Sequence, residues 1–118
     1  MMRALIVEDD PQIRNLLTQV LELDGYEVVE AANGVEGWER MTQIPADLVV
    51  TDLLMPRMDG LDLARRLRES YGDQLKIVIV SSLNGVDDGI TSQNGANAFV
   101  SKPVNVNELR RVIGALMV

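Results

Sequence analysis

The chain has 118 residues, which fits one domain of ordinary size. Apolar residues make up 47% and charged residues 25%, a globular composition that excludes disordered and fibrous proteins. The net charge of −7 disfavours direct binding to nucleic acid, and the lack of Cys and His excludes disulfides, thiolate zinc sites and histidine chemistry. We therefore expect a soluble domain whose chemistry uses carboxylates, hydroxyls and amines.

Short apolar runs alternate with segments of helical period, and this pattern predicts five strand-helix units. Four runs are nearly continuous Val, Ile, Leu and Ala, as in parallel strands covered on both faces, whereas the second carries charges that suit an edge. The first run is too short for a signal peptide or a membrane span, so we expect a cytoplasmic protein without membrane contact. The expected strands are residues 3–8, 26–31, 47–52, 75–81 and 98–101.

Start and stop signals place helices between these strands. The first helix is expected to begin after Asp10, which acts as its cap, with Pro11 in the first position and Gly25 after its end. Asn33 and Asn105 each precede a Glu by three residues, the spacing of a capping box. Residues 84–97 have little helix propensity, which predicts a short or irregular fourth helix. The apolar stripes comprise Ile13, Leu16, Leu17, Val20 and Leu21 in the first helix, and Leu109, Val112, Ile113 and Leu116 in the last.

Repeated strand-helix units with right-handed crossovers predict an α/β fold with a doubly wound parallel sheet. The chain length allows five strands, and the expected order is 2-1-3-4-5, as in flavodoxin-like (βα)5 domains. Ligands of such sheets lie at the carboxyl ends of the strands, where the direction of winding reverses. Here that place lies between the first and third strands.

Polar side chains gather at that edge of the expected sheet. Glu8 and Asp9 follow the first strand, Asp52 and Ser81 close the third and fourth, and Lys102 follows the fifth. Clustered carboxylates repel one another unless a cation neutralises them. Oxygen ligands without His or Cys select Mg²⁺, Mn²⁺ or Ca²⁺, and one or two carboxylates with bound waters suit Mg²⁺ best.

In sum, these residues resemble the receiver domain of two-component response regulators, such as the chemotaxis regulator. The resemblance covers essentially the whole chain. It is carried by four features in order, namely residues 5–11 (LIVEDDP), residues 52–60 (DLLMPRMDG), Ser81, and Phe99 three residues before Lys102-Pro103.

The resemblance implies that Asp52 is the phosphoacceptor and forms an acyl phosphate. The donor would be a phosphohistidine of a histidine kinase or of a histidine phosphotransfer protein. Asp9, Asp52 and the backbone carbonyl of Leu54 would bind Mg²⁺ directly, and Glu8 would act through bound water. Phosphoryl transfer needs mainly positioning and charge neutralisation, which a metal and an ammonium supply.

The remaining site residues would bind the phosphoryl group or report its presence. Lys102 would supply an ammonium, aimed into the site by a cis Lys102-Pro103 bond, and Ser81 would donate its hydroxyl. Ser81 and Phe99 would form the switch, although Phe99 could equally be a plain core aromatic. Leu54 and Leu83, two residues beyond Asp52 and Ser81, are apolar and cannot orient a water, so we expect slow dephosphorylation.

We expect residues 1–118 to form one receiver domain that acts on no separate substrate and whose output domain or protein is unknown. The resemblance also allows a homodimer that forms on phosphorylation. One alternative is an interaction domain that is never phosphorylated. Another is a flavodoxin-like cofactor binder, but such a protein needs a phosphate-binding loop after the first strand, and this sequence has acidic residues there. Taken alone, Asp52 could cap a loop and Lys102 could be a surface lysine.

Overall fold

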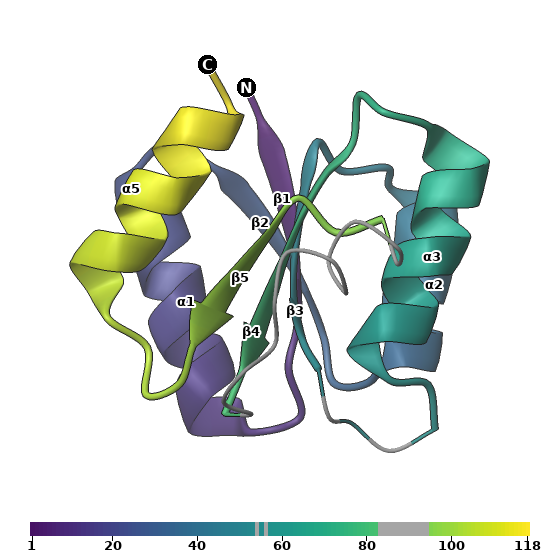
Figure 1. Cartoon of the computed structure of the whole chain (residues 1–118), viewed down its shortest axis with the longest axis horizontal. Helices are drawn as coiled ribbons and strands as arrows, with labels where there is room; N and C mark the ends of the chain where they lie inside the picture. Colours follow the sequence, from purple (N-terminus) through teal and green to yellow (C-terminus); the bar gives the residue numbers. More distant parts are fainter. Residues whose placement is uncertain (54, 56, 83–94) are drawn as a thin grey trace.

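Strands and helices alternate as far as residue 81, and a further strand and helix follow after residue 97 (Figure 1). The computed structural model describes residues 1–53, 55, 57–82 and 95–118. The predicted strands are confirmed with ends that shift by at most one residue, and the predicted fourth helix falls largely outside the described residues. In chain order the elements are β1 Arg3–Val7, α1 Pro11–Leu23, β2 Glu27–Ala31, α2 Gly34–Gln43, β3 Leu48–Asp52, α3 Gly60–Tyr71, β4 Lys76–Ser81, β5 Ala98–Ser101 and α5 Val106–Leu116.

The strands form one parallel sheet in the order β2-β1-β3-β4-β5, as predicted. The charged strand β2 therefore lies at an edge, and the winding reverses between β1 and β3. Helices α1 and α5 cover one face of the sheet, while α2 and α3 cover the other (Figure 1). None of the helices in the described part of the chain is long and apolar enough to cross a membrane.

Side chains that alternate along the strands build two separate cores. In β1, Leu5 and Val7 belong to the core under α2 and α3, whereas Ala4 and Ile6 belong to the core under α1 and α5. Burial on both faces explains why the central strands are largely apolar between their ends. Leu16 was predicted to be buried but is 39% exposed, because it lies at the rim of the apolar stripe of α1.

The predicted caps begin the helices. Asp10 accepts hydrogen bonds through Oδ1 from the backbone N–H of Gln12 at 2.8 Å and of Ile13 at 3.3 Å, so it is a cap as expected. Asn33, Asp59 and Asn105 cap α2, α3 and α5 in the same way. These bonds fix where each helix starts.

Backbone approaches closely at the first residues of α3 and α2. A Cβ atom added at Gly60 would lie 2.1 Å from the carbonyl oxygen of Asp52, and one at Gly34 would lie 2.2 Å from that of Met58. Both glycines are therefore required for space. The start of α3 is packed against the backbone that carries Asp52.

Gly60→Ala should lower the free energy of unfolding by roughly 1–3 kcal/mol, because backbone must move to admit the methyl group. Gly114→Ala is the matched control, since a Cβ at this exposed position in α5 meets nothing within 4 Å. It should raise stability by roughly 0.5–1 kcal/mol through helix propensity. Urea unfolding of both variants measures the difference, and equal stabilities would contradict the crowding at Gly60.

Candidate functional site

The strand register places the first two carboxylates side by side. Val7 of β1 is paired with Thr51 of β3, and each is followed by an acidic residue. Glu8 and Asp52 therefore lie at the same level of neighbouring strands, at the carboxyl edge of the sheet. Asp52 is still within β3, whereas β1 ends one residue before Glu8.

The other side of the site comes from β4 and β5. Ser81 is paired with Ser101, the last residue of β5, and the Lys102 N–H donates to the Ser81 carbonyl oxygen at 2.8 Å. Asp52 is paired with Val80, so Ser81 lies one residue further along the neighbouring strand. The sheet thus brings Ser81 and Lys102 to the edge that carries the carboxylates.

Three carboxylates converge at this edge. Glu8, Asp9 and Asp52 each offer an oxygen, and these oxygens all lie within 4.8 Å of one another. Glu8 is 1% and Asp52 8% exposed, whereas Asp9 is exposed. Carboxylates at this separation repel one another strongly. An oxygen-only cluster of this kind could hold a hard metal ion, and the negative charge makes a cation favourable there.

Lys102 neutralises part of this charge. Its Nζ lies 2.9 Å from Oε1 of Glu8 and 3.1 Å from Oδ2 of Asp52, and the Lys102-Pro103 peptide bond is cis, as expected. Burial alone would lower the pKa of Lys102, but the hydrogen bonds to Glu8 and Asp52 outweigh it and raise the pKa. Lys102 is therefore a firmly charged counter-ion that links two strand ends.

Glu8 titrates near neutrality. Burial raises the pKa of Glu8 from its ordinary 4.5 to about 7, although Lys102 and the backbone N–H of Asp10 favour the charged form. A hydrogen bond with Asp9 and the charge of Asp52 act in the same direction as burial. Without a metal, a proton on Glu8 thus relieves part of the repulsion among the carboxylates.

Backbone contacts hold the acidic turn, which we define as residues 8–10. The Glu8 N–H donates to the Ala31 carbonyl at 3.0 Å, and the Asp10 N–H donates to Oε2 of Glu8 at 3.1 Å. The Arg14 guanidinium donates to the Glu8 carbonyl at 2.7 Å. Sequence reasoning missed Arg14, because its partner in the turn is a backbone carbonyl that no sequence motif marks.

Two further predicted site residues, Ser81 and Phe99, are described by the structure, and their predicted roles stay predictions. Ser81 is buried at the end of β4, and Phe99 of β5 is partly buried against the core under α2 and α3. Leu54 and Leu83 lie outside the described residues. The metal ligand predicted at the Leu54 carbonyl and the slow dephosphorylation attributed to both leucines therefore stay predictions.

Removing the Lys102 ammonium should destabilise the metal-free protein, because it leaves two buried carboxylates without their counter-ion. Lys102→Met should cost about 3 kcal/mol of unfolding free energy at pH 8. The loss should be smaller at pH 5. Because the pKa of Glu8 is raised in the folded state, its protonation contributes stability fully below about pH 4.5, and this contribution is lost as the pH rises through about 7.

Urea unfolding of wild type and Lys102→Met between pH 5 and 8, in the presence of a chelator, measures the loss of unfolding free energy at each pH. Lys76→Met is the matched control, because its Nζ contacts only the Asp73 carbonyl, at 3.5 Å, among the contacts described for it. Its effect should be small and independent of pH. A pH-independent loss in Lys102→Met would contradict the assigned charge balance.

The sequence matches a known family over nearly its whole length. The pattern of the response regulator receiver domain family covers residues 4–114. The chain is 39% identical to the response regulator GtcR of Aneurinibacillus migulanus, over 86% of this chain and 41% of that protein. It is 38% identical to the response regulator MprA of Mycobacterium leprae, over 98% of this chain and 51% of that protein. With the DNA-binding dual master transcriptional regulator RpaA of Synechocystis it shares 33% identity, over 99% of this chain and 49% of that protein.

Solved structures show the same fold. The response regulator TrrA of Thermotoga maritima, in complex with Mg(2+)-BeF, is 34% identical with a TM-score of 0.88, over 98% of this chain and 99% of that one. A receiver domain protein of Clostridium thermocellum is 27% identical with a TM-score of 0.88, over 99% and 94% of the two chains. The chain spans about half the length of the curated relatives it matches. It belongs to the response regulator receiver domain family, whose known role is that of a phosphoacceptor in two-component signalling.

Proposed function

We propose that residues 1–118 form one receiver domain whose Asp52 accepts a phosphoryl group and thereby switches the domain. The observation that supports this most directly is the place of Asp52, whose carboxylate lies 3.1 Å from the Lys102 ammonium and beside Glu8 and Asp9. The donor is a phosphohistidine of a histidine kinase or a histidine phosphotransfer protein. Because the chain contains no His, this donor must be another protein or domain.

The carboxylates fit Mg²⁺ better than a softer ion. All three offer hard oxygen atoms, and neither His nor Cys is available in the chain. In this proposal Asp9 and Asp52 bind Mg²⁺ directly and Glu8 acts through water, while the carbonyl of Leu54, outside the described residues, is the further ligand that the family resemblance implies. Bound there, Mg²⁺ would supply positive charge to the phosphoryl oxygens. The presence of Mg(2+)-BeF in the TrrA structure supports this choice.

The chain's own groups account for the rest of the transfer. A carboxylate oxygen of Asp52 attacks phosphorus, the P–N bond to the donor imidazole breaks, and the nitrogen keeps the electron pair. A carboxylate nucleophile needs no general base, so the transfer depends on positioning and charge. In this proposal Lys102, whose contact with Asp52 supports the role, holds the reacting oxygens, and Ser81, at the neighbouring strand end, donates its hydroxyl to the new phosphoryl group. Phe99 then changes its packing at β5 and reports the modification.

The proposed output passes through another domain or protein. RpaA is described as DNA-binding, but this chain corresponds to 49% of that protein and has a net charge of −7, which disfavours contact with a phosphate backbone. We therefore propose no direct contact with nucleic acid or membrane for this chain, and we allow a homodimer that forms on phosphorylation. In this proposal it works in the cytoplasm, where a kinase forms the phosphodonor from ATP.

Incubation with Mg²⁺ and acetyl phosphate should give wild type a single phosphoryl adduct, detected by intact mass, because Asp52 is the nucleophile. Asp52→Asn should show none. Asp59→Asn is the matched control, since Asp59 caps α3 and Asn caps a helix equally well, so it should keep the adduct. ATP alone should modify none of these proteins. Wild type without an adduct would favour a domain that only binds partners.

Mg²⁺ should stabilise wild type by about 2.7 kcal/mol when present at a hundred times its dissociation constant, because only the folded state assembles the site. Asp9→Asn should lose most of this gain. Asp10→Asn should keep it, since the Asp10 side chain accepts hydrogen bonds from helix amides. Thermal melts with and without Mg²⁺ measure the gain, and equal responses of the two variants would contradict the assignment of Asp9.

A further inference from the structure

We propose that Arg14 is a positioning residue that fixes the acidic turn for metal binding. This inference rests on the proposed function, because it concerns how Glu8 and Asp9 are presented to Mg²⁺. Arg14 lies one turn into α1 and is not itself a ligand. It acts through the backbone of the turn.

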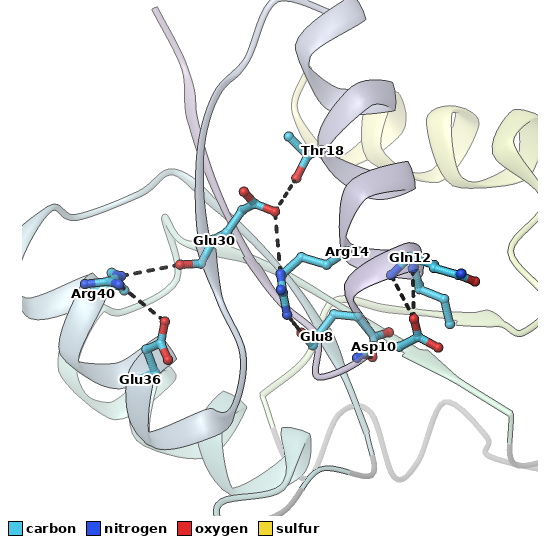
Figure 2. Close-up of polar contacts among 9 residues, drawn as sticks. Glu8, Asp10, Gln12, Arg14, Thr18, Glu30, Glu36 and Arg40 are labelled. Atoms are coloured by element: carbon cyan, nitrogen blue, oxygen red, sulfur yellow. Dashed lines mark hydrogen bonds and ion pairs between the residues drawn. The ribbon is translucent and has the colours of Figure 1, made fainter.

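The contacts of Arg14 point in two directions (Figure 2). One nitrogen of its guanidinium donates to the Glu8 carbonyl at 2.7 Å, and its Nε lies 3.6 Å from Oε1 of Glu30 on β2. The Thr18 hydroxyl donates to the same Glu30 oxygen at 3.1 Å. The side chain of Arg14 is 23% exposed, so most of it is enclosed between α1 and the sheet edge. Glu30 thus anchors Arg14, and Arg14 anchors the turn.

The Glu8 carbonyl is the atom through which this anchor reaches the site. Strand β1 ends at Val7, so the peptide between Glu8 and Asp9 lies beyond the strand. A peptide unit is planar, so a fixed carbonyl sets the orientation of the following N–H and Cα. The Glu8 N–H is already held by Ala31. With both ends of Glu8 held, Asp9 leaves the strand in a defined direction.

The arrangement requires an arginine. Its planar fork can donate to a carbonyl on one side while it faces a carboxylate on the other. A lysine carries the same charge at one point and would satisfy one of these partners. Arg14→Lys therefore keeps the electrostatic field and removes the two-sided hold.

Positioning and charge predict effects of opposite sign. Arg14 carries a positive charge near a site for a dication, so if it acted only through its field, removing it would tighten Mg²⁺ binding. If it positions the turn, removing it weakens binding, because Asp9 and Glu8 are then less well oriented. The sign of the change in affinity separates the two roles.

The test compares Arg14→Met, Arg14→Lys and Arg40→Met with wild type, as complete chains. Arg40 is the matched control, since it donates to the Glu30 carbonyl at 3.3 Å and is paired with Glu36 at 3.3 Å. It touches the same residue of β2 but, among the contacts described for it, not the acidic turn. Calorimetric titration gives the Mg²⁺ dissociation constant, and amide hydrogen exchange without metal reports the order of residues 8–10.

Arg14→Met should weaken Mg²⁺ binding about tenfold, the lower end for groups that orient metal ligands. Arg14→Lys should weaken it by a smaller factor, and Arg40→Met should leave it unchanged. Exchange of the turn amides in metal-free Arg14→Met should be faster than in wild type. This readout does not depend on metal or on phosphorylation.

Unchanged or tighter Mg²⁺ binding in Arg14→Met would overturn the inference. A variant that is less stable than wild type but binds Mg²⁺ equally well would overturn it too. Should Arg14→Met fail to fold, Arg14→Lys decides, because a pure field effect leaves its affinity at the wild-type value. If wild type itself binds no Mg²⁺, the proposed metal site is rejected, and this inference is rejected with it. Wild-type binding with unaffected Arg14 variants rejects the inference alone.

Discussion

Repulsion among carboxylates at one sheet edge governs this structure. Glu8, Asp9 and Asp52 meet within 4.8 Å, and Lys102 contacts two of them. When all are ionised, one positive charge faces three negative ones, so two remain uncompensated. A proton on Glu8 or a divalent cation relieves this excess in different ways, which makes the site sensitive to both. The fold tolerates the cluster because the strand ends are held from several sides.

Much of the fold could be predicted because its signals are local. Apolar runs marked the strands, and a doubly wound sheet of five strands with the charged second strand at its edge predicted the order that the structure has. Cap residues such as Asp10 predicted where helices begin, because each accepts hydrogen bonds from backbone N–H groups within the next three residues. Leu16 was assigned to the core wrongly, because it lies about 100° round α1 from Leu17, at the rim of the apolar stripe, where the rotation of the helix on the sheet decides whether a side chain is enclosed. Such rotations depend on packing against the sheet.

The site, too, has residues that could be predicted from the sequence and one that could not. That Glu8, Asp52 and Lys102 would converge followed from topology alone, because parallel strands end at one edge. The contacts of Arg14 could not be predicted in this way, because its partners are a backbone carbonyl and Glu30 on another strand. Backbone acceptors leave no mark in a sequence. Contacts of this kind become visible only when the turn and the neighbouring strand are placed together.

The division of the interior into two cores has a consequence for how the chain tolerates change. Side chains under α1 and α5 are separated by the sheet from those under α2 and α3, against which Phe99 packs. Substitutions on opposite faces share no side-chain partners, so their effects on stability should be additive, whereas neighbours within one core should be coupled. Core side chains under α1 and α5 can therefore be replaced by others of similar volume without repacking the core against which Phe99 lies.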